Sequence, residues 1–86
     1  MADLSVNFLH PTNGQIITVT IDDTMTCREV VGELIANDFV SASSEGYDLA
    51  IKGGSLLEGQ KSMAQNGVRE GMTIRVIPAT DAGVVH

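Results

Sequence analysis

The stretch Thr26-Cys27-Arg28-Glu29-Val30-Val31-Gly32-Glu33-Leu34-Ile35 decides the fold class, because it encodes a helix with a single apolar face. Thr26 and Glu29 have the spacing of a capping box, in which each side chain accepts a hydrogen bond from a backbone N–H at the helix start. The apolar residues recur at helical spacing and form one stripe, made of Cys27, Val30, Val31, Leu34 and Ile35. We therefore predict one amphipathic helix that buries this stripe against the rest of the chain.

Two strands are predicted before the helix. Apolar residues alternate with polar ones from Leu4 to Phe8 and again from Ile17 to Ile21, which is the period of half-buried strands. Between them, the segment 10–14 contains Pro and an Asn-Gly pair, and Asn-Gly favours the positive φ angles of hairpin turns. The first quarter of the chain is thus predicted to form a β-hairpin.

The second half of the chain is predicted to add further strands and little helix. The expected elements are a loop at 41–46, a strand at 47–51, a short strand at 55–57, one helical turn at 62–66 and a last strand from Met72 that Pro78 ends. This order predicts an α+β fold of the β-grasp type, with a mixed four- to five-stranded sheet and one packed helix. We expect residues 1–78 to form the domain and residues 79–86 to form a flexible tail.

Composition narrows the possible functions. The chain has 86 residues, which is enough for one modest core and too few for a two-domain enzyme. Its net charge of −6 makes nucleic acid and anionic membranes poor electrostatic partners, so we expect protein partners. One cysteine excludes an internal disulfide and favours a cytoplasmic location. We find neither a signal peptide nor an apolar run that would span a membrane.

The chain resembles ubiquitin and its relatives from about Leu4 to Gly83. The resemblance rests on the order and spacing of elements, and on segments that match the family's helix, strands and short turn. These segments are Thr26, Cys27, Val30 and Leu34, then 49–53, 56–59, Met63, Val68 and 73–77. Two single-residue insertions are needed, one in the first hairpin turn and one near Lys61.

In this alignment the family's terminal Gly-Gly falls on Ala82-Gly83, and Val84-Val85-His86 follow. The resemblance implies a modifier precursor that a peptidase cleaves between Gly83 and Val84. It also implies activation of the new carboxylate by an adenylating enzyme, transfer to a carrier enzyme and an isopeptide bond to a target protein. The weak match at surface residues suggests a bacterial conjugation system, with antiviral defence as one possible role.

Two alternatives remain open. The first is a ubiquitin-like interaction module that is not conjugated, of the type associated with type VII secretion, in which Gly83 has no role. The second is a sulfur carrier that uses a C-terminal glycine as a thiocarboxylate. The extension after Gly83 counts against a sulfur carrier, because such carriers usually end at Gly-Gly.

The resemblance also implies a partner-binding patch on the sheet. Matching residues places it on Ala50, Arg75 and Ile77, with Leu9 nearby in the first hairpin. The chain has two lysines, Lys52 and Lys61, as possible acceptors for isopeptide bonds.

Catalytic and metal-binding residues are not indicated. Cys27 lies at a helix start, which favours a thiolate, yet its place in the apolar stripe predicts burial in the core. His10 and His86 lie far apart in the sequence and show no metal-ligand spacing. We expect a monomer that is not itself an enzyme and needs no cofactor or metal.

Overall fold

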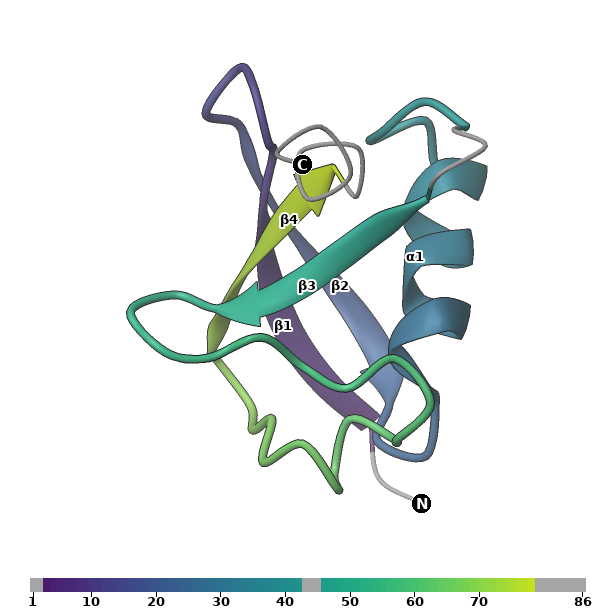
Figure 1. Cartoon of the computed structure of the whole chain (residues 1–86), viewed down its shortest axis with the longest axis vertical. Coiled ribbons are helices and arrows are strands. Elements are labelled where there is room, and N and C mark those ends of the chain that lie inside the picture. Colours follow the sequence, from purple (N-terminus) through teal and green to yellow (C-terminus); the bar gives the residue numbers. More distant parts are fainter. Residues whose placement is uncertain (1–2, 43–45, 79–86) are drawn as a thin grey trace, which may run out of the picture.

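The computed structural model describes residues 3–42 and 46–78. Within these residues a four-stranded sheet packs on one helix (Figure 1). The elements in chain order are β1 (Asp3–Leu9), β2 (Ile16–Asp22), α1 (Cys27–Ala36), β3 (Tyr47–Ile51) and β4 (Thr73–Pro78). The described helix is not long and apolar enough to cross a lipid bilayer.

The sheet has the strand order β2-β1-β4-β3. β1 and β2 form the predicted antiparallel hairpin, and β3 pairs antiparallel with β4. The two central strands, β1 and β4, run parallel, so the chain must cross the sheet between them. The sheet is therefore mixed, as the β-grasp prediction requires.

The start of α1 has the predicted capping box. The Thr26 hydroxyl accepts the Glu29 backbone N–H at 3.2 Å, and the Glu29 carboxylate accepts the Thr26 N–H at 2.9 Å. Both bonds satisfy N–H groups that have no partner inside the helix. After α1, Asp38 adopts a φ of 59°, which redirects the chain toward the loop before β3.

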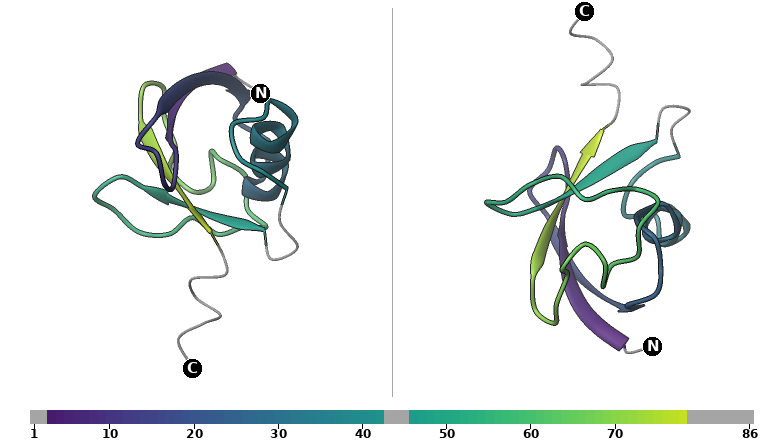
Figure 2. Two further views of the ribbon diagram at one scale, coloured as in Figure 1. Left: turned by 90° about the horizontal axis from the view of Figure 1, so that it is seen from above. Right: turned by 60° about the horizontal axis from the view of Figure 1, so that its bottom comes forward.

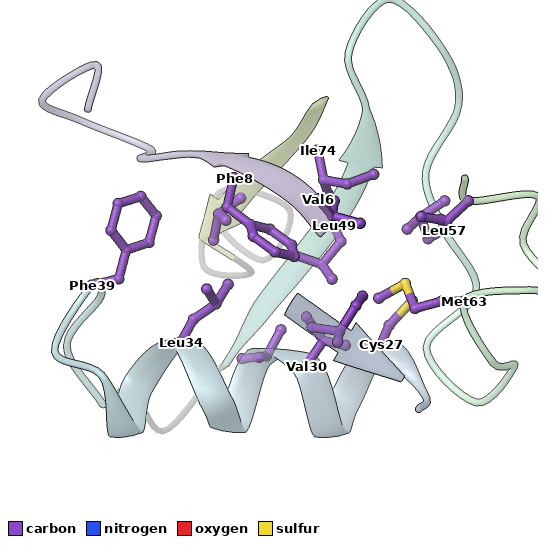
Figure 3. Packing of buried hydrophobic residues seen from close by; sticks show 14 of the residues in the cluster. Val6, Phe8, Cys27, Val30, Leu34, Phe39, Leu49, Leu57, Met63 and Ile74 are labelled. Atoms are coloured by element: carbon purple, nitrogen blue, oxygen red, sulfur yellow. The ribbon is translucent and has the colours of Figure 1, made fainter. Parts of the chain in front are cut away.

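The core lies between α1 and the inner face of the sheet. Figure 3 shows Val30 and Leu34 of the helix pointing toward the side chains of Phe8 and Leu49. Phe8, Val30 and Leu34 are fully buried, and Leu49 is almost so. Burying such aliphatic and aromatic side chains is the main stabilising contribution in a domain of this size.

The connection between β3 and β4 has no regular structure but is well bonded. It reaches the start of α1 (Figure 2), where the Met63 N–H donates to the Met25 carbonyl at 2.8 Å. The Asn66 side chain holds two parts of the connection together. Its carbonyl oxygen accepts the Glu58 N–H at 2.8 Å, and its amide donates to the carbonyls of Glu58 and Ser62.

Two details of the second half differ from the prediction, whereas the predicted helical turn at 62–66 is confirmed. The segment 55–57 forms one isolated bridge, Leu56 with Ala50, instead of a strand. The last strand begins at Thr73, and Pro78 is its final residue, because a proline at a strand end need not donate to the ladder. The helical turn at 62–66 is present as a turn, closed by the Asn66 N–H on the Ser62 carbonyl at 3.0 Å.

Candidate functional site on the outer face of the sheet

The face of the sheet opposite the helix carries a row of residues in register across all four strands. Leu9 of β1 pairs with Ile16 of β2 on one side and with Arg75 of β4 on the other. Arg75 pairs in turn with Ala50 of β3, and Ala50 pairs with Leu56. We call Ile16, Leu9, Arg75, Ala50 and Leu56 the cross-sheet row. Strand pairing brings these five residues together from positions up to 66 apart in the chain.

The two ends of the cross-sheet row are the largest exposed apolar side chains in the described part of the chain. Ile16 is 56% exposed and Leu56 is 61% exposed. Leu9 is half-buried between them, and so is Ile77, which lies two residues beyond Arg75 on the same face of β4. Apolar side chains that gather on one exposed face are typical of a protein-binding surface.

One residue of the predicted patch, Ala50, is almost completely buried. Ala50 is only 5% exposed, and it lies outside the core cluster. Its small side chain lies in the row between those of its pairing partners, Arg75 and Leu56. Ala50 therefore offers a partner little surface, and its place in the binding patch stays a prediction. Leu9, Arg75 and Ile77 do share the outer face, as predicted.

Two exposed residues of the row, Ile16 and Leu56, were not part of the predicted patch. Ile16 was detectable, because the Asn13-Gly14 turn sets the hairpin register and thereby pairs Ile16 with Leu9. Leu56 was harder to find, since its place depends on a single bridge to β3.

Arg75 gives the centre of the cross-sheet row a positive charge. Its side chain is exposed, and no carboxylate within residues 3–42 and 46–78 forms an ion pair with it. Lys52 is also exposed and directly follows β3. The net charge of the chain is −6, so the positive charge of this exposed arginine is opposite in sign to the charge of the protein as a whole. An apolar partner surface that carries an acidic residue complements this arrangement.

Two shallow hollows flank the end of β4. One has a volume of about 170 Å³ and is lined in part by Leu9, Arg75 and Ile77. The other, of about 310 Å³, is lined in part by Thr12, Tyr47 and Pro78. His10 and Pro11 border both hollows.

The residues of the predicted processing site, Ala82, Gly83 and Val84, lie outside the described residues. β4 ends at Pro78, so five residues separate the sheet from the bond after Gly83.

The two lysines differ in their surroundings. Lys61 forms an exposed ion pair with Glu58 at 2.9 Å, whereas Lys52 has no such pair in the described part of the chain.

Cys27 lies in the core, as predicted. Only 4% of its surface is exposed, and burial raises the pKa of the Cys27 thiol above its ordinary value. A buried neutral thiol is a poor nucleophile, because the thiolate is the reactive form.

His10 has a structural place in the first turn. Its Nδ1 atom accepts the backbone N–H groups of Thr12 and Asn13 at 3.1 and 3.2 Å, and its ring meets Phe39 edge to face at 5.2 Å. Among the described residues, no three His, Cys, Asp or Glu side chains are grouped so as to hold a metal ion.

The fold is that of ubiquitin. The structure matches the ubiquitin of Caldiarchaeum subterraneum with a TM-score of 0.71 and 16% identity, over 90% of this chain and 94% of that one. The ubiquitin-like domain of Plasmodium falciparum Dsk2 matches with a TM-score of 0.65 and 23% identity, over 87% and 99%. The ubiquitin-like domain of the Mycobacterium tuberculosis type VII secretion protein EccD1 matches with 0.64 and 14%, over 90% and 99%.

No protein-family model and no curated protein sequence matches this chain. The likeness is therefore one of fold, and the chain has the ubiquitin-like β-grasp fold.

Proposed function

We propose that this protein is a ubiquitin-like modifier, made as a precursor and cleaved after Gly83. Hydrolysis of the Gly83–Val84 peptide bond releases the segment that begins at Val84 and leaves a carboxylate on Gly83. An adenylating enzyme then activates this carboxylate, a carrier enzyme accepts it as a thioester or ester, and an amine of a target protein displaces the carrier.

The observation that carries the proposal is the place where β4 ends. β4 is a central strand of the sheet, and it ends at Pro78, five residues before the new carboxylate. Five extended residues span about 17 Å at most. This length lets the Gly83 carboxylate enter an active site while the domain stays outside. Ala82 and Gly83 carry almost no side chain, so they favour passage through a narrow channel.

The domain itself contributes recognition, not chemistry. We propose that the processing and conjugating enzymes dock on the outer face, through Arg75, Leu9 and Ile77 and through the exposed Ile16 and Leu56. Lys52 is the better acceptor for a second copy of the modifier, since the ammonium group of Lys61 is engaged by Glu58 at 2.9 Å. Cys27 takes no part, because its thiol is buried.

The test is the intact mass of the protein expressed with an N-terminal tag in its native host. We expect a species ending at Gly83 and further bands in which this species is joined to larger proteins. Gly83→Val should block both the cleavage and the formation of adducts, since a β-branched side chain obstructs the narrow channel of an enzyme. The matched control His86→Ala changes a residue beyond the cleaved bond and should leave the cleavage and the adducts unchanged.

A chain that keeps His86 and forms no adducts would overturn the modifier proposal. Such a result would favour a binding module that is not conjugated. The cytoplasmic location, monomeric state, bacterial origin and role in antiviral defence stay predictions, which the host and the neighbouring genes would test.

A further inference from the structure

The chain contains two Asn-Gly pairs, and the fold holds them in different ways. Asn13-Gly14 lies in the turn between β1 and β2, which projects from one end of the domain (Figure 1). Asn66-Gly67 lies in the connection between β3 and β4. An asparagine before glycine is the most prone to lose its side-chain amide spontaneously, because glycine has no side chain that hinders attack by its own nitrogen. The two pairs therefore present the same chemistry in two different surroundings.

The loss of the amide requires two groups to meet. The backbone nitrogen of the glycine, after it gives its proton to a base in the solvent, attacks the Cγ atom of the asparagine side chain. A hydrogen bond that engages the glycine N–H keeps its proton in place, and hydrogen bonds on the asparagine amide keep Cγ away from the nitrogen. The bonds on these two groups therefore decide how readily each pair reacts.

Asn66-Gly67 is held at both groups. The Gly67 N–H donates to the Ala64 carbonyl at 3.0 Å. The half-buried Asn66 side chain accepts the Glu58 N–H at 2.8 Å, and its amide donates to the carbonyls of Glu58 and Ser62 at 3.1 and 3.0 Å. These bonds must break before the two groups can react. Asn66 therefore loses its amide only when the connection opens locally.

Asn13-Gly14 has much weaker restraints. Both residues are exposed, and the Gly14 N–H forms no hydrogen bond within residues 3–42 and 46–78. The Asn13 amide donates one long bond, of 3.4 Å, to the Gln15 side chain. A β-carbon placed on Gly14 would meet no heavy atom within 4 Å beyond its chain neighbours, so the space beside it is open to water and base. The φ angles of Gly14 and Gly67 are 75° and 79°, so glycine conformation does not distinguish the two pairs.

The Asn13 side chain also lies along the backbone in a way that favours the reaction. Its Oδ1 atom accepts the Gln15 N–H at 2.8 Å. An asparagine oxygen that accepts from two residues further on folds back past the intervening nitrogen, here that of Gly14. Attack at Cγ places negative charge on this oxygen, and a donor already directed at it stabilises that charge. The first turn thus favours the reaction that the bonds around Asn66 oppose.

We propose that Asn13 is a site of spontaneous modification, at which the folded protein converts its first turn from a neutral to an anionic one. The deprotonated Gly14 nitrogen forms a bond to Cγ of Asn13, and the bond from Cγ to Nδ2 breaks. The base returns its proton to the departing nitrogen, which leaves as ammonia. Water then opens the cyclic imide. Opening at Cγ gives aspartate, and opening at the main-chain carbonyl gives isoaspartate, in which the chain continues through Cγ; both products release a proton and keep a carboxylate.

Both products change the first turn. They add a negative charge to a chain whose net charge is already −6, and they add it next to Thr12, which lines one of the hollows beside β4. Isoaspartate also lengthens the main chain between His10 and Gln15, so it disturbs the bond of 2.7 Å from the His10 N–H to the Gln15 carbonyl. This reaction does not depend on cleavage after Gly83, so failure of either proposal leaves the other standing.

The test incubates the full chain at mildly alkaline pH and follows both asparagines by mass spectrometry of proteolytic peptides. We expect the amide to be lost from Asn13 at least about tenfold faster than from Asn66, because Asn66 reacts only after local opening. The rate at Asn13 should rise with pH, since the attacking nitrogen must lose its proton. An isoaspartyl carboxyl methyltransferase with S-adenosylmethionine should label the incubated protein. It should not label Asn13→Gln, whose longer side chain would have to form a larger ring.

Two controls separate the effect of the fold from that of the sequence and of the added charge. In urea the hydrogen bonds around both pairs are lost, so the rates at Asn13 and Asn66 should become similar. Asn13→Asp reproduces the aspartate product and keeps the main chain unchanged. The backbone amide of His10 should therefore shift in the NMR spectrum of the isoaspartate form far more than in that of Asn13→Asp.

Three results would overturn the proposal. The first is an Asn13 that stays intact on incubation, and the second is equal reaction of the two asparagines in the folded protein. The third is a difference between them that persists in urea, because it would then come from the neighbouring sequence and not from the hydrogen bonds of the fold.

Discussion

Leu56 and Leu57 are neighbours in the sequence, yet they lie on opposite sides of the sheet. Leu57 is 9% exposed and belongs to the core, while Leu56 is 61% exposed on the outer face. Two adjacent leucines have the same intrinsic hydrophobicity, so the difference comes from the direction each side chain takes. The inner face of the sheet stabilises the fold, and the outer face remains available for partners.

We expect the largest loss of stability from a substitution in the core. Leu57→Ala should lower the free energy of unfolding by about 2–5 kcal/mol, since it removes buried methyl groups and leaves a cavity. Leu56→Ala should change it by less than about 0.5 kcal/mol. Urea unfolding of both variants measures the difference. Similar losses in the two variants would mean that the inner and outer faces are assigned wrongly.

A smaller effect is expected at the start of α1, which holds the helix against the inner face. Thr26→Ala removes the hydroxyl that accepts the Glu29 N–H and should cost about 1 kcal/mol. Thr26→Ser keeps that hydroxyl and should recover most of the loss. Thermal unfolding of the three proteins measures this. If Thr26→Ser were as unstable as Thr26→Ala, the missing capping hydrogen bond would not be the cause of the lost stability.

The ionisation of the Cys27 thiol makes the stability of the fold depend on pH, and this dependence tests whether Cys27 is buried on the inner face. Its pKa is raised in the folded state by burial, so the unfolded chain releases the thiol proton at lower pH than the folded one. Stability from this group is complete below the unfolded pKa and is lost as the pH rises through the folded pKa. In Cys27→Ala, the free energy of unfolding should fall less as the pH rises through this range, and unfolding curves at several pH values measure the difference. In the unmodified protein, a thiol reagent should react only as fast as the core opens.

The smallest effect on stability is expected on the outer face. Arg75→Glu and Leu56→Ser should each leave the free energy of unfolding within about 0.5 kcal/mol of the unmodified protein. Under the proposed function, both should nevertheless reduce the adducts formed in the native host. Unfolding curves and adduct yields, measured on the same variants, separate the two roles. Normal adduct yields would remove the outer face from the docking surface.

The hairpin, the helix with its cap and the last strand were predictable, because each depends on a short-range pattern. Asn13-Gly14 specifies the turn, and Thr26 with Glu29 specifies the helix start. The short strand at 55–57 was not predictable as a single bridge, since an apolar doublet does not reveal how much of it pairs. Within the candidate site, Leu9, Arg75 and Ile77 were found by resemblance.

By itself the sequence determined the order of elements, the faces of α1 and the alternation along each strand, because these follow from local backbone geometry. Only the tertiary structure decided that Ala50 is covered and that Leu56 is exposed. These properties depend on which strands lie side by side. Strand neighbours are set by packing between residues far apart in the chain, and no local pattern encodes that packing.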